Sequence, residues 1–136
     1  MMKVLIIDDD RSLRYALARI LINAGYEISM AGEGEHGLAV YRQDRPDLVI
    51  CDLNMPHVNG IATIGKLRAE EPSLKIIAIS GGGQSMNAEG LVKALETGAD
   101  EIMIKPIRAS DLIAQVQNML GPVEPDDSVE QERPHP

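Results

Sequence analysis

The chain has 136 residues, which is enough for one domain with a substantial hydrophobic core and too few for two ordinary domains. Its formal net charge is −8 and no segment concentrates Lys and Arg, so we expect no nucleic-acid partner. No apolar run approaches the ~18 residues that cross a bilayer, and the start lacks the layout of a signal peptide. We therefore expect a cytoplasmic protein without a membrane partner.

Aromatic residues are scarce, with three Tyr and neither Trp nor Phe, so the core must consist of aliphatic side chains and Met. We expect the tyrosines to pack at the edge of the core and the methionines to fill gaps in it. These residues are Tyr15, Tyr26, Tyr41, Met86, Met103 and Met119. The single Cys51 excludes an internal disulfide, and its place in an apolar run favours packing over reactivity.

Short apolar runs alternate with amphipathic segments along the chain. The predicted strands are 4–7, 26–30, 48–51, 74–79 and 101–104. The predicted helices are 13–24, 34–41, 61–69, 86–97 and 110–120. Asp10 suits the N-cap of the first helix, and Gly25 suits the position just after its end. Five strands alternating with five helices predict an α/β fold, a parallel sheet with helices on both faces.

The last part of the sequence differs in composition from the rest. Residues 121–136 carry five acidic residues, one Arg and four Pro, with almost no hydrophobic side chains. We expect a domain over residues 1–120 and a disordered acidic tail, defined as residues 121–136, with no second domain.

The run from Arg45 to Gly60 is central to the functional interpretation. Its strand, 48–51, is wholly apolar, which is typical of a strand buried on both faces, and it leads directly into Asp52. Turn residues follow, including Asn54, Met55-Pro56 and Asn59-Gly60. Because ligands of open α/β sheets bind at the carboxyl ends of the strands, Asp52 is a candidate site residue.

Other predicted strands also end on polar residues. The first ends on Asp8-Asp9, the fourth on Ser80 and the fifth on Lys105. These strand ends open on one edge of the sheet, so their side chains can converge with Asp52. Crowded carboxylates need a compensating cation, and oxygen ligands without Cys or His favour Mg²⁺. A hydroxyl and an ammonium opposite the metal would form a pocket for a phosphoryl group.

Taken singly, these residues have plainer interpretations. Asp10 is expected to serve only as a helix cap, Ser80 could be a turn residue and Lys105 a solvated charge. The three histidines are expected to be solvated surface residues rather than metal ligands or phosphocarriers; they are His36, His57 and His135.

Four stretches in order along residues 3–120 resemble the receiver domain of two-component response regulators. They are Val-Leu-Ile-Ile-Asp-Asp-Asp (4–10), Pro-Asp-Leu-Val-Ile-Cys-Asp-Leu-Asn-Met-Pro (46–56) with Asn59-Gly60, Ile-Ala-Ile-Ser-Gly (77–81) and Gly-Ala-Asp-Glu-Ile-Met-Ile-Lys-Pro (98–106). The resemblance implies a flavodoxin-like five-stranded parallel sheet in the order 2-1-3-4-5.

The resemblance also implies roles for the strand-end residues. Asp52 would be the phosphoacceptor, and Lys105 and Ser80 would hold the phosphoryl oxygens. Mg²⁺ would be bound by carboxylates and one backbone carbonyl; the implied ligands are Asp8, Asp9, Asp52 and Asn54 through its carbonyl. Lys105-Pro106 is a plausible cis peptide.

The implied function is that of a stand-alone signalling switch in a phosphorelay. A sensor histidine kinase or a histidine phosphotransfer protein would supply the phosphoryl group, and altered protein–protein binding would carry the signal to a downstream protein. The chain would catalyse only its own phosphorylation and dephosphorylation, and would be a monomer or a weak phosphorylation-dependent dimer.

The sequence departs from the family at two places that usually hold aromatic residues, which are Ile102 and Ile107 here. The aromatic switch of the family is therefore in doubt. We hypothesise that the signal runs through residues 80–83, which contain three glycines, and the helix behind them, which contains Gly90.

Three other functions stay open at this stage. A Mg²⁺-dependent phosphohydrolase with an aspartyl nucleophile typically needs an acid two residues later, where this chain has Asn54. A flavin or nucleotide binder needs a phosphate loop after the first strand, where this chain has three acidic residues. A phosphorylation-independent scaffold is disfavoured because every position of the expected site is filled.

Overall fold

The computed structural model describes residues 2–54, 60–81 and 88–121. Its elements, in chain order, are β1 (Lys3–Ile7), α1 (Arg11–Asn23), β2 (Glu27–Ala31), α2 (Gly34–Asp44), β3 (Leu48–Asp52), α3 (Gly60–Glu70), β4 (Lys75–Ser80), α4 (Ala88–Thr97), β5 (Glu101–Ile104) and α5 (Ala109–Leu120). The strands form one parallel sheet in the order β2-β1-β3-β4-β5, which confirms the predicted fold and order.

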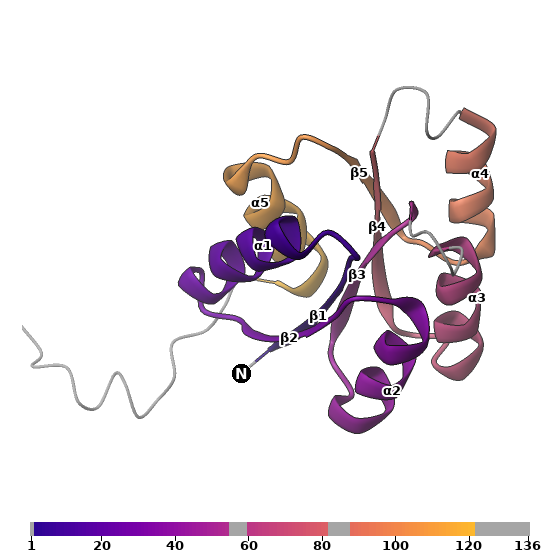
Figure 1. Cartoon of the computed structure of the whole chain (residues 1–136), viewed down its shortest axis with the longest axis horizontal. Coiled ribbons are helices and arrows are strands. Elements are labelled where there is room, and N and C mark those ends of the chain that lie inside the picture. Colours follow the sequence, from indigo (N-terminus) through magenta and orange to yellow (C-terminus); the bar gives the residue numbers. More distant parts are fainter. Residues whose placement is uncertain (1, 55–59, 82–87, 122–136) are drawn as a thin grey trace, which may run out of the picture.

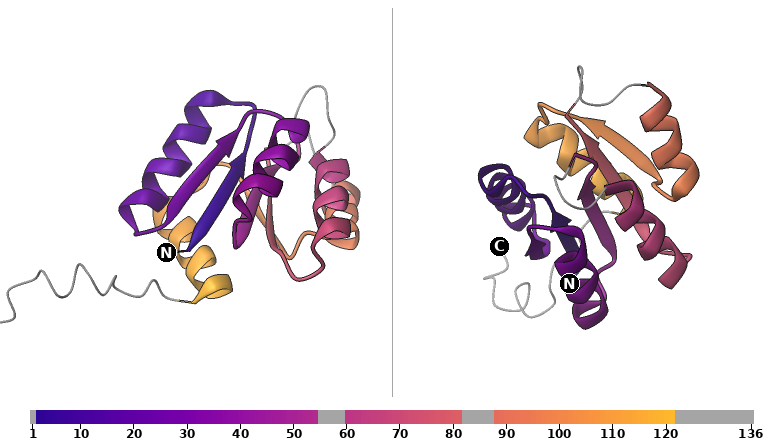
Figure 2. Two further views of the ribbon diagram at one scale, coloured as in Figure 1. Left: turned by 90° about the horizontal axis from the view of Figure 1, so that it is seen from below. Right: turned by 45° about the vertical axis from the view of Figure 1, so that its right-hand side comes forward.

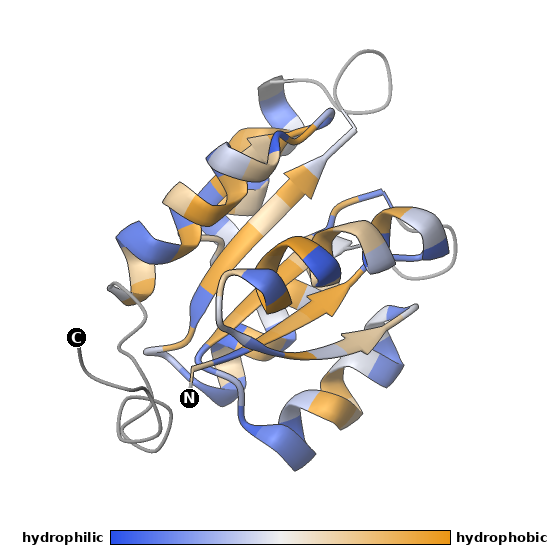
Figure 3. Ribbon diagram, turned by 90° about the vertical axis from the view of Figure 1, so that its left-hand side faces the viewer, coloured by the Kyte–Doolittle hydropathy of each residue, from blue (hydrophilic) through white to orange (hydrophobic). Residues whose placement is uncertain are grey.

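The sheet lies between two layers of helices (Figures 1 and 2). Because successive side chains of a strand point to opposite faces, β1 supplies Val4 and Ile6 to one core and Leu5 and Ile7 to the other. The first core packs under α1 and α5, and the second packs under α2, α3 and α4. Figure 3 shows strands that are largely hydrophobic and helices whose hydrophilic residues lie on their outer sides.

All five residues of β3 are buried, as its apolar sequence predicts. Cys51 belongs to the core under α2, α3 and α4, which confirms its packing role. Met103 and Met119 are partly buried against the core under α1 and α5, which confirms that they fill gaps in the core. Met86 lies outside the described residues. None of the described helices is long and apolar enough to cross a membrane.

The tyrosine prediction holds for two of the three residues. Tyr26 and Tyr41 are buried, but Tyr15 is 49% exposed, so its predicted core-edge position is wrong. The inner side of α1 is occupied by Leu17, Ala18 and Leu21, which turns Tyr15 toward solvent. Its ring lies instead beside two arginine side chains of the same helix.

Asp10 caps α1 as predicted, because its side chain accepts a hydrogen bond from the backbone N–H of Leu13 at 3.1 Å. Gly25 follows the helix with a positive φ of 102°, the conformation expected just after a helix end. α2 continues three residues beyond its predicted end and stops at Arg45, whose left-handed backbone conformation ends the helix.

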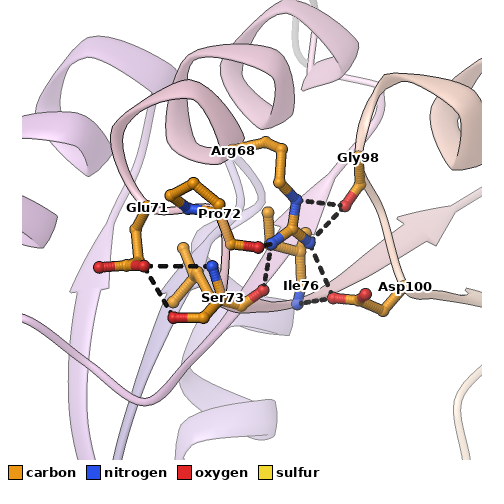
Figure 4. A network of polar contacts seen from close by, with 8 residues as sticks. Arg68, Glu71, Pro72, Ser73, Ile76, Gly98 and Asp100 are labelled. Atoms are coloured by element: carbon orange, nitrogen blue, oxygen red, sulfur yellow. Dashed lines mark hydrogen bonds and ion pairs between the residues drawn. The ribbon is translucent and has the colours of Figure 1, made fainter.

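Arg68 ties α3 to the starts of β4 and β5 (Figure 4). Its guanidinium donates hydrogen bonds to three backbone carbonyls and to one carboxylate, at distances from 2.5 to 3.2 Å. The acceptors are Pro72, Leu74, Gly98 and Asp100. Gly98 has a φ of 150°, and a Cβ there would lie 2.9 Å from the Cβ of Arg68, so glycine is required by both backbone and packing.

We expect Arg68→Met to lower the free energy of unfolding by about 2–4 kcal/mol. Methionine keeps much of the aliphatic stem but leaves several partly buried carbonyls without their donor. Urea unfolding followed by circular dichroism measures this change.

The matched control is Arg42→Met, which removes an arginine whose guanidinium, in the described part of the chain, bonds only Glu70 across the surface of α2 and α3. The Arg42 side chain is 58% exposed, against 22% for Arg68, so its loss should lower the free energy of unfolding much less than the loss of Arg68 does. Equal effects of the two substitutions would show that the carbonyl contacts of Arg68 add nothing to stability.

Candidate functional site

The carboxyl ends of four strands meet at one edge of the sheet. The strand register pairs Ile7 with Cys51, Asp52 with Ile79 and Ser80 with Ile104. The residue after β1 is Asp8, and the residue after β5 is Lys105. The fold therefore sets Asp8, Asp52, Ser80 and Lys105 along the same edge, as the sequence predicts.

Asp8 is held in place through three of its polar groups. Its backbone N–H donates to the carbonyl of Ala31 at 3.1 Å, and its own carbonyl accepts from Nη1 of Arg14 at 2.7 Å. Its Oδ1 accepts from the backbone N–H of Asp10 at 2.9 Å. Its Oδ2 is buried and has no hydrogen-bond partner among the residues that the structure describes. This oxygen lies 3.8 Å from Nζ of Lys105.

Arg14 is a site residue that the sequence interpretation missed. The helical pattern shows only that Arg14 lies off the apolar stripe of α1, and the contact with the Asp8 carbonyl depends on how the helix sits above the sheet. Gly32 gives the guanidinium room, because a Cβ at that position would lie 3.2 Å from Nη1 of Arg14.

Asp52 is buried at the end of β3. Its Oδ1 accepts from the backbone N–H of Asn54 at 3.0 Å, and its Oδ2 lies 3.6 Å from Nζ of Lys105. The backbone N–H of Lys105 donates to the carbonyl of Ser80 at 2.8 Å, which links the ends of β4 and β5. Ser80 is buried, and the Lys105–Pro106 peptide bond is cis, as predicted.

The three carboxylates converge on one point. Asp8, Asp9 and Asp52 each offer a ligand oxygen, and these oxygens lie within 4.8 Å of one another. Asp9 is exposed and the other two are buried. Within the described part of the chain, the cluster of three carboxylates forms ion pairs with one ammonium, that of Lys105, which lies near Asp8 and Asp52. The cluster therefore keeps an excess of negative charge that a cation would neutralise. The oxygen donor set and the unbonded Oδ2 of Asp8 fit a hard divalent cation such as Mg²⁺.

The start of α3 touches the backbone that carries Asp52. A Cβ built on Gly60 would lie 2.2 Å from the carbonyl oxygen of Asp52 and 2.7 Å from Cα of Leu53. The sequence pattern predicts Gly60 as a turn residue. The structure requires glycine here because the start of α3 meets the backbone at the end of β3. Its neighbours Met55 to Asn59, including His57, lie outside the described residues, and His36 is exposed on α2.

The comparisons with known proteins agree with this site. The family model of the response regulator receiver domain matches residues 4–117. The chain belongs to this family. Receiver domains bind Mg²⁺ at an acidic site, and the Asp cluster of this receiver domain has the matching composition.

Relatives of known name or structure resemble this receiver domain over most of its length. It is 32% identical to the response regulator MprA of Mycobacterium leprae over 129 residues, which is 95% of this chain and 55% of that protein. A CheY-like receiver domain protein from Methanospirillum hungatei superposes with a TM-score of 0.83 at 28% identity, covering 98% and 99% of the two chains. Chemotaxis protein CheY4 of Vibrio cholerae gives a TM-score of 0.81 at 28% identity, covering 88% of this chain and 98% of its own. The chain thus spans about half the length of the MprA relatives.

Burial and charge shift two ionisable groups of this receiver domain. Burial raises the pKa of Asp8 to about 6, assisted by the negative charge of Asp52 and opposed by the Asp10 N–H and by Lys105. Burial, with the charges of Asp52 and Asp8, also raises the pKa of the Cys51 thiol, which makes this thiol unreactive at neutral pH.

The raised pKa of Asp8 predicts how stability depends on pH without Mg²⁺. The carboxyl titrates near 3.8 when unfolded and near 6 when folded, so between these values the folded state binds more protons. Raising the pH through this window should lower the free energy of unfolding by up to about 3 kcal/mol, and Asp8→Asn should remove this loss. At about pH 7.5 we expect Asp8→Asn to be more stable than the unsubstituted protein and to gain less from added Mg²⁺.

Thermal unfolding at several pH values, with EDTA or with Mg²⁺, measures both effects. Asp10→Asn is the matched control, because it makes the same chemical change in the same loop and Asn keeps the helix cap. This control should retain the pH profile and the Mg²⁺ response of the unsubstituted protein. An Asp8→Asn profile identical to that of the control would contradict the assignment of a charged, buried Asp8.

The close approach at Gly60 gives a second prediction. Gly60→Ala should lower the free energy of unfolding by about 2 kcal/mol or more and weaken Mg²⁺ binding, because the new methyl group displaces the backbone at Asp52. Gly65→Ala in the same helix is the control, since its Cβ would meet only Cγ2 of Thr97, at 3.2 Å. Helix propensity favours Ala there by up to about 1 kcal/mol, so this control should be near neutral. Chemical denaturation measures the free energy of unfolding of both variants, and Mg²⁺ titration measures their affinity for the metal.

Proposed function

We propose that this receiver domain is a phosphorylation-dependent switch of a two-component phosphorelay, with Asp52 as the phosphoacceptor. The observation that carries the proposal is the burial of Asp52 within 3.6 Å of the Lys105 ammonium, inside a cluster of three carboxylates. Membership of the family supports a histidine kinase, or a histidine phosphotransfer protein, as the donor.

Mg²⁺ would be held by the carboxylates of Asp9 and Asp52 and the backbone carbonyl of Asn54, with Asp8 acting mainly through water. When bound, it would neutralise charge on the transferring phosphoryl group. The unbonded and buried Oδ2 of Asp8 supports this ligand set, because a carboxylate oxygen rarely stays buried without a partner.

The residues of the chain would perform the transfer mainly by positioning. An oxygen of Asp52 forms the new P–O bond as the P–N bond to the donor imidazole breaks, and the electron pair returns to the imidazole nitrogen. The Lys105 ammonium and the Ser80 hydroxyl would hold the phosphoryl oxygens. The hydrogen bond from Asn54 N–H to Oδ1 supports this arrangement, because it fixes one oxygen of Asp52 and leaves the other facing Lys105.

The signal would reach a downstream protein through altered protein–protein binding, with the chain a monomer or a weak phosphorylation-dependent dimer. Ile102 and Ile107, at the positions that usually hold aromatics, pack against opposite cores. This placement supports an output route other than an aromatic side-chain switch. The route hypothesised from the sequence uses residues 80–83, of which 82 and 83 lie outside the described residues.

A phosphohydrolase is the second candidate. Its general acid would occupy position 54, where this chain has Asn54, whose side chain carries no carboxyl group. The backbone N–H of Asn54 bonds the Asp52 carboxylate. The chain would therefore catalyse its own phosphorylation and dephosphorylation without turning over a separate substrate.

Incubation with Mg²⁺ and a small phosphodonor, followed by intact mass measurement, tests the proposal. The unsubstituted protein should gain one phosphoryl group that is stable in acid and labile in base, and Asp52→Asn should gain none. Lys105→Gln should slow the gain by about tenfold or more, because one charged contact to the phosphoryl group is lost.

Asp47→Asn is the matched control, because Asp47 precedes the other end of β3 and its carboxylate accepts only from the backbone N–H of Lys3 among the described residues. It should be phosphorylated like the unsubstituted protein. Phosphorylation of Asp52→Asn would refute Asp52 as the acceptor. No phosphorylation of the unsubstituted protein would refute the switch and leave a scaffold as the better interpretation.

A further inference from the structure

The solvent face of α1 combines apolar and cationic side chains. Tyr15 and Ile22 are 49% and 55% exposed, and they lie seven residues apart on one side of the helix. Arg11 and Arg19 share that side and are also exposed. The guanidinium carbons of Arg11 and Arg14 lie 5.6 and 5.8 Å from the centre of the Tyr15 ring. We call this surface the α1 face and define it as Arg11, Tyr15, Arg19 and Ile22.

The charge of α1 is unusual for this protein. The helix contains three Arg and no acidic residue, whereas each of the other four described helices contains at least one Asp or Glu. The whole chain has a net charge of −8. The α1 face is therefore a cationic surface with two exposed apolar side chains, which favours an acidic and partly apolar occupant.

The acidic tail matches this surface in charge. It carries Glu124, Asp126, Asp127, Glu130 and Glu132 against the single Arg133, and it contains two valines, Val123 and Val129. Its four prolines favour an extended backbone that can lie along a helix.

The tail also starts in the right place. α1 and α5 each follow a strand of the same parallel sheet, so they run in the same direction and end at the same end of the domain (Figure 2). The last residues of both helices, among them Ile20 and Leu120, pack against one core. The tail thus leaves α5 next to the end of α1 that carries Ile22.

The tail is long enough to cover the face. α1 has 13 residues, which corresponds to about 20 Å. The 15 residues after Gly121 can extend over about 50 Å at most, so the tail can run the full length of α1.

We propose that the acidic tail lies along the α1 face of the same molecule, with its carboxylates beside Arg11 and Arg19 and its valines against Tyr15 and Ile22. α1 begins three residues after Asp8, so this contact would cover the surface next to the cluster of Asp8, Asp9 and Asp52. A macromolecule that binds the α1 face would compete with the tail for that surface.

Paramagnetic relaxation enhancement in the full chain tests the contact. A nitroxide on Ser128→Cys labels the tail alone, because Cys51 is fully buried. We expect the label to reduce the intensity of amide signals along α1 and not along α4, on the other face of the sheet. The loss should disappear in about 1 M NaCl, where the Debye length is about 3 Å.

Two charge variants of the labelled protein test the mechanism. In the first, all five tail acids become Gln or Asn, which leaves residues 1–121 unchanged. In the second, Arg11 and Arg19 become Gln; its matched control replaces Lys66 and Lys93, which are exposed on α3 and α4, with Gln. The intensity loss along α1 should vanish in both charge variants and persist in the lysine control.

Four outcomes would overturn the proposal. They are no intensity loss along α1, a stronger loss on another element that is not adjacent to the end of α5, a loss that persists when the tail acids are neutralised, and a loss transferred between molecules. The last is detected by mixing spin-labelled chains with ¹⁵N-labelled chains that lack the nitroxide, and it would assign the α1 face to a second copy.

Discussion

The repulsion among Asp8, Asp9 and Asp52 is the constraint on which the rest of the site depends. Their ligand oxygens lie within 4.8 Å of one another, and the Lys105 ammonium is the one ion-pair partner of the cluster among the described residues. Burial strengthens the effect, because it removes the water that would solvate the charges and raises the pKa of Asp8. The cluster is therefore an unfavourable arrangement that a divalent cation would relieve, so metal binding would be linked to stability.

The fold holds this unfavourable cluster together by fixing the backbone beneath it. Arg14 and Ala31 bond the main chain of Asp8, and Gly60 lets α3 approach the main chain of Asp52. At the opposite edge of the sheet, Arg68 binds the carbonyls that precede β4 and β5. The strands cannot spread to relieve the repulsion without breaking these contacts, so the carboxylates stay close together.

Charge is also distributed unevenly on the outside of the molecule. α1 carries three arginines in an acidic chain, and it starts beside the cluster of Asp8, Asp9 and Asp52. A cationic helix next to an anionic site lowers the repulsion that any acidic or phosphorylated partner would meet there. The proposed contact with the acidic tail uses the same charges, so the tail and a partner would compete for one surface.

The sequence by itself determined the α/β alternation, the burial of β3 and the strand ends at Asp8, Asp52, Ser80 and Lys105, because periodicity and turn residues are local signals. It also indicated the Asp10 cap and the packing role of Cys51. The folded structure was needed to show that Arg14 bonds the Asp8 carbonyl and that Gly60 must lack a side chain. These features depend on the rotation of α1 and the approach of α3 to β3, and such packing between distant segments leaves no mark in local sequence pattern.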